Sequence, residues 1–254
     1  QAAYDYAIKN YHDKIQNILT PKKTDLKMVV NGNEAISLGA VAAGMKFSAI
    51  YPMTPTSGIL HTLAALQDKY DFVCKLPEDE IAAINMAIGA SFAGVRAMVA
   101  TSGGGFCLMT EAYGLAGIAE IPVVIINGMR GGPATGLPTW TEQGDLRMVL
   151  HAHQSDFPRI VLAAGDIEEA FHLTMQAFNL ADQYQTPVVL LVDKQICESH
   201  MSLGLFDYKD YKADTGKLLL KKEDNYKRFA LSPDGISMRT PAGFGNYVMA
   251  NSDE

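Results

Sequence analysis

Residues 97–127, AMVATSGGGFCLMTEAYGLAGIAEIPVVIIN, decide the fold. Two apolar runs of strand length, Ala97–Thr101 and Val123–Asn127, flank an apolar segment of helical length at 106–118. Strands that are apolar on both faces, each followed by a helix, are typical of a parallel sheet that is covered on both sides. This stretch therefore predicts one strand–helix–strand unit of an α/β domain.

The same alternation of strand and helix continues on both sides of this unit. Further strands are expected at Met28–Val30, Ser48–Tyr51, Phe72–Lys75, Arg159–Leu162 and Val188–Val192, and further helices near 34–44, 57–70, 80–94, 143–151 and 167–184. We therefore predict the α/β class with a doubly wound, mostly parallel sheet. Ligands of such sheets bind at the carboxyl ends of the strands, where glycine-rich turns begin the helices.

The two ends of the chain fall outside this alternation. Residues 1–27 predict a short amphipathic helix over 4–19 and a polar linker, and residues 28–200 form the expected α/β domain. Residues 201–254 are charged and then rich in Pro, Gly and Asn, which indicates an extended arm or the start of a further domain. The first residue is glutamine rather than methionine, so we expect the chain to be a portion of a longer subunit.

Composition limits the possible classes of function. Hydrophobic residues make up 48% of the 254 residues and charged residues only 19%, below the usual level of about 25%. The net charge of −7 argues against a nucleic-acid partner, and no apolar run reaches the ~18 residues of a membrane span. Cys74, Cys107 and Cys197 are scattered, which is compatible with a cytoplasmic protein and excludes an iron–sulfur cluster held on four cysteines of this chain.

A proline-stiffened turn, YPMTPTS at 51–57, follows one expected strand. Pro52 and Pro55 fix the backbone, while Thr54, Thr56 and Ser57 supply hydroxyl groups. The turn is either a cap in which Thr56 or Ser57 begins the next helix, or a rigid lip that binds a carboxylate.

Acidic residues precede the apolar helix at 80–94. The macrodipole of a helix favours acids in its first turn, which accounts for at least one of Glu78, Asp79 and Glu80. Glu80 directly precedes the apolar run Ile81–Ile84, so its carboxyl could instead exchange a proton with a ligand nitrogen.

Two glycine-rich turns follow the strands of the central unit. Ser102, Gly103 and Gly104 open a turn that is either simply tight or allows a ligand close to the backbone; it is neither a P-loop nor a dinucleotide fingerprint. Arg130 is the one cation in the stretch 127–139, and is either a solvated loop arginine or a binder of carboxylate. Trp140 beside this loop suggests a packed interface.

Taken together and in this order, the motifs resemble one family. VNGNEAISLGAVAAG, YPMTPTSG, EDEIAAINMAIGASFAGVRA, TSGGGFCLMTEAYGLAGIAEIPVV and MRGGPATGLPTWTEQGDL are similar to the α subunit of 2-oxoacid:ferredoxin oxidoreductases, most closely the 2-oxoglutarate type. The resemblance covers residues 28–200 and implies the pyrimidine-binding module of the thiamine-diphosphate-binding fold. A β subunit would share the thiamine diphosphate and hold Mg²⁺, and partner chains would hold the 4Fe–4S clusters that pass electrons to ferredoxin.

The resemblance also implies roles for particular residues. Glu80 would form a hydrogen bond with N1′ of the aminopyrimidine, and Thr54 and Arg130 would contact the 2-oxoacid. These three are the expected catalytic residues. Pro52, Ser102, Gly103 and Gly104 would line the cofactor site, Pro55 would lie beside the substrate, and this chain would bind no metal. The implied reaction is oxidative decarboxylation of a 2-oxoacid to acyl-coenzyme A and CO2, in a dimer of αβ units. The second carboxylate of 2-oxoglutarate would need another cation, from Arg96, Arg147 or the partner chain.

Two other classes of function remain. A scaffold or regulatory subunit could keep this fold without its chemistry. A nicotinamide-dependent dehydrogenase is the third hypothesis, but the first strand-to-helix turn, Gly32-Asn33-Glu34, lacks the glycine fingerprint of that class.

Overall fold

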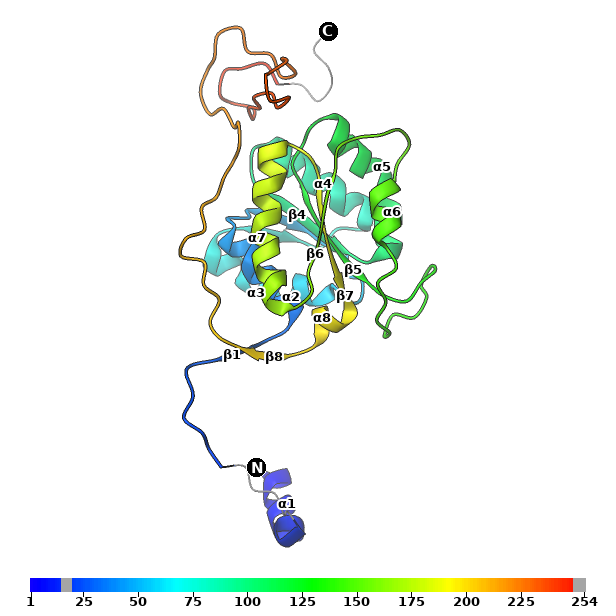
Figure 1. Cartoon of the computed structure of the whole chain (residues 1–254), viewed down its shortest axis with the longest axis vertical. Coiled ribbons are helices and arrows are strands. Elements are labelled where there is room, and N and C mark those ends of the chain that lie inside the picture. Colours follow the sequence, from blue (N-terminus) through cyan, green and yellow to red (C-terminus); the bar gives the residue numbers. More distant parts are fainter. Residues whose placement is uncertain (15–19, 249–254) are drawn as a thin grey trace.

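A six-stranded parallel sheet forms the centre of the computed structural model, which describes residues 1–14 and 20–248 (Figure 1). The strand order is β3-β2-β4-β5-β7-β6, and every pairing in this sheet is parallel. The strands are β2 (Phe47–Ala49), β3 (Val73–Lys75), β4 (Ala97–Thr101), β5 (Val124–Met129), β6 (Ile160–Ala163) and β7 (Val188–Asp193). Every residue of β4 and β5 is buried, as expected for central strands covered on both faces.

Helices cover both faces of the sheet. On one face lie α2 (Gly32–Ala42), α3 (Ser57–Tyr70) and α7 (Ile167–Tyr184), whose apolar residues share one hydrophobic core. On the other face α4 (Glu80–Phe92), α5 (Gly103–Ile118) and α6 (Leu146–His151) contribute to a second core. The predicted doubly wound, mostly parallel α/β fold is therefore confirmed.

Helix α5 begins earlier than the apolar pattern predicts. The pattern placed its start at residue 106, whereas the structure begins the helix at Gly103 with Ser102 as the N-cap. Glycine is a poor helix former, so its low helix propensity gives no sign that three successive glycines form the first turn of a helix.

Helix α4 ends earlier than predicted. Gly94 has a positive φ of 103°, and the helix stops at Phe92 rather than at residue 94.

The expected strand Met28–Val30 exists, but it does not belong to the parallel sheet. As β1 it pairs antiparallel with β8 (Met201–Leu203) in a separate two-stranded sheet. The sequence pattern missed β8 and the short helix α8 (Lys194–Glu198), because both are too short to show a period. Asp193 caps α8 by accepting a hydrogen bond from the Ile196 amide at 2.9 Å.

The segment before the sheet is shorter in helix than predicted. The amphipathic pattern over 4–19 corresponds to α1 (Ala2–Tyr11) and a 3-10 turn at His12–Lys14, and residues 15–19 lie outside the described part. No residue of α1 is buried, so its apolar face packs against nothing in the described structure. None of the helices in the described part of the chain is both long and apolar enough to cross a membrane.

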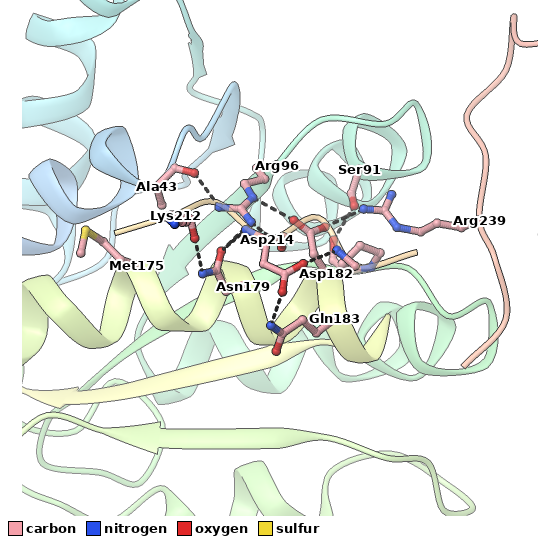
Figure 2. Close-up of polar contacts among 12 residues, drawn as sticks. Ala43, Ser91, Arg96, Met175, Asn179, Asp182, Gln183, Lys212, Asp214 and Arg239 are labelled. Carbon is pink, nitrogen blue, oxygen red and sulfur yellow. Dashed lines mark hydrogen bonds and ion pairs between the residues drawn. The ribbon is translucent and has the colours of Figure 1, made fainter. Parts of the chain in front are cut away.

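Residues 204–248, here called the C-terminal arm, contain no helix or strand in the described structure; the arm first runs along α7 and then coils beyond the end of that helix (Figure 1). A buried ion-pair network ties this arm to the amino-terminal edge of the sheet (Figure 2). Asp182 on α7 accepts from Arg96 at 2.8 Å and from Arg239 of the arm at 2.6 Å. Burial raises the pKa of Asp182, and the guanidinium groups of Arg239 and Arg96 oppose that shift.

Arg96 is the centre of this network (Figure 2). Besides Asp182, it donates to the Ala43 carbonyl at 2.7 Å, the Asn179 side chain at 2.7 Å, the Asp214 carbonyl at 2.9 Å and the hydroxyl of Tyr211 at 2.9 Å. Its side chain is only 7% exposed. Arg96 is therefore committed to holding α2, α7 and the arm together.

Candidate active site

A pocket of about 350 Å³ lies at the carboxyl ends of β4 and β5. Ser102, Gly103 and Gly104 from the start of α5 form one side, and Arg130 with the following loop forms another. The remaining lining residues are Cys107, Gly131, Gly132, Pro133, Ala134, Asp145 and Met148. Two glycine-rich turns that were separate in the sequence thus meet around one pocket.

The three glycines that open α5 have different surroundings. A β-carbon on Gly103 would lie 2.6 Å from a carboxylate oxygen of Asp145, and one on Gly105 would lie 2.7 Å from Oε1 of Glu80 and overlap the hydroxyl of Thr101. A β-carbon on Gly104 would find its nearest neighbour at 3.7 Å. Two carboxylates therefore lie against the first turn of α5 at positions where only glycine leaves room.

Glu80 is the more deeply buried of these two carboxylates. It opens α4, where Asp79 caps the helix by accepting a hydrogen bond from the Ala82 amide at 2.7 Å. Glu80 is 3% exposed, and its Oε1 has no hydrogen-bond partner among the described residues. A buried carboxylate oxygen without a donor is costly, so this atom is available to a donor supplied by a ligand.

Arg130 directly follows β5 and reaches the proline-stiffened turn. Its Nη1 donates a hydrogen bond to the backbone carbonyl of Thr54 at 2.8 Å, and the Thr54–Pro55 peptide is cis. The Pro55 carbonyl accepts in turn from the buried side chain of Asn33 at 2.9 Å. Pro52 is exposed on the outer side of this turn.

Of the two alternatives for this turn, the helix start at Thr56 and Ser57 is confirmed, but the side-chain capping bond is not. Thr56 is the N-cap residue of α3, but its side chain makes no capping bond to that helix. Its hydroxyl donates instead to the Met53 carbonyl at 3.0 Å, and so closes the proline-containing turn upon itself. The turn is thus held by a hydrogen bond between two of its own residues.

The segment after Arg130 is fixed to the sheet by side chains whose roles the sequence did not indicate. Asn127, fully buried on β5, donates to Asp145 at 2.9 Å, and Gln143 donates to Asp193 at the end of β7 at 2.7 Å. Glu142 accepts from the Gly132 amide at 3.1 Å. Polar residues at the ends of apolar strands, such as Asn127 and Asp193, were the available signal, but their partners lie in a loop of no regular period.

The structure brings some of the expected site residues together and separates others. Ser102, Gly103, Gly104 and Arg130 share the pocket, and Arg130 links it to Thr54. In the described structure, the lining of the pocket does not include Glu80, Thr54, Pro52 or Pro55. Glu80 lies beside Gly105, in the first turn of α5.

Two further sequence expectations concern cations and Trp140. Arg96 precedes β4 and lies at the opposite edge of the sheet, so it is wrong as a ligand for a second carboxylate in this pocket. Arg147 is exposed on α6. Trp140 is 67% exposed, so it packs into no interface with the described residues.

The first strand-to-helix turn offers little room for a nicotinamide cofactor. A β-carbon on Gly32 would overlap the backbone of Ile196, because α8 packs directly on this turn. Among the described residues, no three His, Cys, Asp or Glu side chains are grouped as a metal site would require.

An open parallel sheet, with a pocket at its carboxyl edge and an unpartnered buried glutamate beside a glycine turn, defines the class of α/β ligand-binding domains. Comparison with known families makes the assignment narrower. The family described as pyruvate flavodoxin/ferredoxin oxidoreductase, thiamine diphosphate-binding, matches residues 38–253, and the chain belongs to it.

Individual relatives agree with this family. The chain is 41% identical to the α subunit of 2-oxoacid:ferredoxin oxidoreductase 1 from Sulfurisphaera tokodaii, over 94% of this chain and 41% of that protein. It is 46% identical to the 2-oxoglutarate synthase subunit KorA of Archaeoglobus fulgidus, over 70% of this chain and 51% of that protein. The chain thus spans about two fifths to one half of the length of these relatives.

A solved structure shares the fold. It is the 2-oxoglutarate:ferredoxin oxidoreductase from Magnetococcus marinus, solved with 2-oxoglutarate, coenzyme A and succinyl-CoA bound. The match has a TM-score of 0.89 at 33% identity and covers 98% of this chain and 44% of that chain. The resemblance to the α subunits of 2-oxoacid:ferredoxin oxidoreductases is therefore confirmed.

Proposed function

We propose that this chain supplies the pyrimidine-binding half of a thiamine-diphosphate site in a 2-oxoacid:ferredoxin oxidoreductase. The enzyme oxidatively decarboxylates a 2-oxoacid, with 2-oxoglutarate favoured, and transfers the acyl group to coenzyme A. The single observation that carries the proposal is the unpartnered Oε1 of Glu80, buried beside the first turn of α5. Family membership and the named relatives support the reaction class.

The residues present fit the cofactor. Glu80 offers an acceptor in a buried place, and the lack of a side chain at Gly105 lets Glu80 and Thr101 lie directly against the first turn of α5. When bound, thiamine diphosphate supplies the nucleophilic carbon and the electron sink for decarboxylation. The part of Glu80 is to hold and exchange a proton at a ring nitrogen, since burial shields its carboxylate from water.

Arg130 and Thr54 are the proposed substrate residues. Arg130 spends one donor on the Thr54 carbonyl, which fixes the direction of its guanidinium group and leaves other donors for a carboxylate. Ser102, Gly103 and Gly104 bring the backbone of α5 to the same pocket. The oxoacid would therefore lie between the start of α5 and the end of β5.

The rest of the catalytic apparatus is proposed to lie in partner chains. We propose a β subunit that shares the cofactor and holds Mg²⁺, iron–sulfur clusters that pass electrons to ferredoxin, and assembly as a dimer of αβ units. The three cysteines of this chain are scattered and too few to hold a cluster on four thiolates, which supports clusters in partner chains, and a cytoplasmic location is proposed because no disulfide framework is indicated.

The test is co-expression with the β subunit of the same complex, followed by oxoacid-dependent reduction of a viologen dye. Wild type is compared with Glu80→Gln, using 2-oxoglutarate and pyruvate in turn. We expect Glu80→Gln to lower turnover by about 10²- to 10⁴-fold, the usual contribution of a positioned proton-transfer group. Glu111→Gln, an exposed glutamate on α5, is the matched control and should keep its turnover.

Full turnover in the Glu80→Gln complex would overturn the assignment of Glu80 and favour the scaffold hypothesis. Preference for pyruvate over 2-oxoglutarate would correct the substrate but keep the reaction class.

A further inference from the structure

The pocket offers two places where an anion could bind. One is Arg130, and the other is the amino-terminal end of α5, a helix of 16 residues whose first turn lines the same pocket. Helix N-termini attract anions through their free N–H groups and their dipole. A 2-oxoacid that could bind either place with its carboxylate would have two competing orientations.

Asp145 occupies the side of this helix end with a negative charge. Its two carboxylate oxygens lie 2.6 and 3.0 Å from the place where a β-carbon of Gly103 would stand. This carboxylate does not serve its own helix, because Asp145 is the N-cap residue of α6 but makes no side-chain capping bond there. The carboxylate lies instead against the first turn of α5.

The position of the Asp145 carboxylate is fixed by a residue of β5. Oδ2 accepts a hydrogen bond from Nδ2 of Asn127 at 2.9 Å, and Asn127 is fully buried on β5. The neighbouring Gln143 is bonded to Asp193, so the backbone on the amino side of Asp145 is held as well. A carboxylate held in this way cannot swing aside to admit an anion without breaking a buried hydrogen bond.

Ser102, the N-cap residue of α5, adds only a neutral hydroxyl group at this end of the helix. Ser102 is 0% exposed, makes no side-chain cap, and its hydroxyl has no partner among the described residues. With Asp145 beside Gly103 and Glu80 beside Gly105, the helix end carries two acids and one free hydroxyl. Of the residues that line the pocket in the described structure, Arg130 is the one cation.

We propose that Asp145 is a specificity-determining residue that closes the N-terminus of α5 to anions. The carboxylate of the oxoacid is thereby directed to Arg130, and one substrate orientation is selected. The part that concerns the oxoacid rests on the proposed function, whereas the exclusion of anions from α5 does not.

Exclusion is tested on the 254-residue chain with inorganic phosphate as the probe. The backbone amide signals of Gly103, Gly104 and Gly105 are followed by NMR during a phosphate titration. We expect at most weak binding in wild type, where Arg130 is the cation of the pocket, and binding at least about tenfold tighter in Asp145→Asn, which keeps the size of the side chain and removes its charge. Glu111→Gln removes an exposed charge farther along α5, outside the pocket lining, and should behave as wild type.

Equal phosphate binding in wild type and Asp145→Asn would overturn the proposal. So would amide signals of Gly103, Gly104 and Gly105 that do not shift when phosphate is added to Asp145→Asn. A dispersed amide spectrum shows that Asp145→Asn is folded. If it is not, Asp145→Ala replaces it under the same criteria.

A second measurement separates this inference from the proposed function. In the assembled enzyme, a carboxylate bound at α5 would be non-productive, so Asp145→Asn should lower kcat and KM in the same proportion and leave kcat/KM unchanged. A merely structural role would lower kcat/KM, and that result would overturn the inference. If no oxoacid is turned over by wild type, the proposed function fails while the phosphate titration still decides the role of Asp145.

Discussion

Arg130 Nη1 lies 2.8 Å from the carbonyl oxygen of Thr54, and this bond joins the end of β5 to the proline-stiffened turn that follows β2. The two residues are 76 positions apart in sequence, and their bond links the turn to Arg130 in the pocket lining. A guanidinium group can hold that carbonyl and a ligand carboxylate at once, because its five donors lie in a planar fork. A lysine ammonium group has no such fork.

Arg130→Lys is therefore expected to impair oxoacid use although it keeps the charge. Loss of a charge-assisted, bidentate contact should lower kcat/KM for the oxoacid by about 10- to 100-fold. The measurement is steady-state viologen reduction by the complex with its β subunit. Glu111→Gln, the exposed variant on α5, is the control. Equal losses in both variants would contradict a special role for Arg130.

The first turn of α5 allows a matched pair of glycine substitutions. A β-carbon at Gly105 would overlap Thr101 and press on Glu80, so Gly105→Ala should lower the free energy of unfolding by about 1–3 kcal/mol. Gly104→Ala has room and a better helix propensity, so it should leave this free energy unchanged or raise it by up to about 1 kcal/mol. Urea unfolding of the two variants measures both values. Similar values for the two would show that Glu80 does not lie against this turn.

The buried network around Asp182 gives a prediction about the C-terminal arm (Figure 2). Asp182→Asn leaves Arg96 and Arg239 without their carboxylate, and breaking such a buried pair costs about 3–5 kcal/mol. We expect limited proteolysis to cut the arm of this variant much faster than that of wild type. Lys46→Ala breaks the exposed ion pair with Asp71 and should change little. An arm equally protected in Asp182→Asn and wild type would show that the network does not hold it.

The sequence was sufficient to predict the layers of the fold. Ala97–Thr101 is apolar on both faces and appears unchanged as β4, and the helices at 57–70 and 167–184 have the bounds that their apolar periods predict. The apolar pattern did not predict the structure correctly where the backbone conformation or the choice of pairing strand decides it. Met28–Val30 has a strand pattern, but nothing local shows that its partner is Met201–Leu203 rather than the parallel sheet.

The site was predictable by residue type more readily than by contact. The resemblance to the family singled out Glu80, Ser102 and Arg130, whereas the residues alone left a structural and a functional interpretation open for each. The bond between Asp145 and Asn127 depends on how a loop without regular structure folds back on β5. Arg96 shows the opposite case, because a free-looking arginine in the sequence is consumed by a buried network with residues 53 to 118 positions away.

A pH dependence is expected from Asp214 in the C-terminal arm. Hydrogen bonds from Gln183 on α7 and from the Gly216 amide hold the pKa of this carboxyl below its usual value of 3.8. The folded state therefore binds fewer protons than the unfolded state near pH 3–4. The resulting stabilisation is fully present above pH 4 and is lost as the pH falls through the folded pKa.

Asp214→Asn should accordingly be less stable than wild type at pH 7, by less than about 1 kcal/mol because the carboxyl is exposed. The difference in the free energy of unfolding should shrink as the pH falls from 5 to 3, since Asp214 of the unfolded wild-type chain then takes up a proton and the charge-dependent stabilisation declines. Urea unfolding at several pH values measures this difference, with Asp210→Asn as a second exposed carboxylate of the same arm. A difference that stays constant down to pH 3 would show that the ionised form of Asp214 does not hold Gln183.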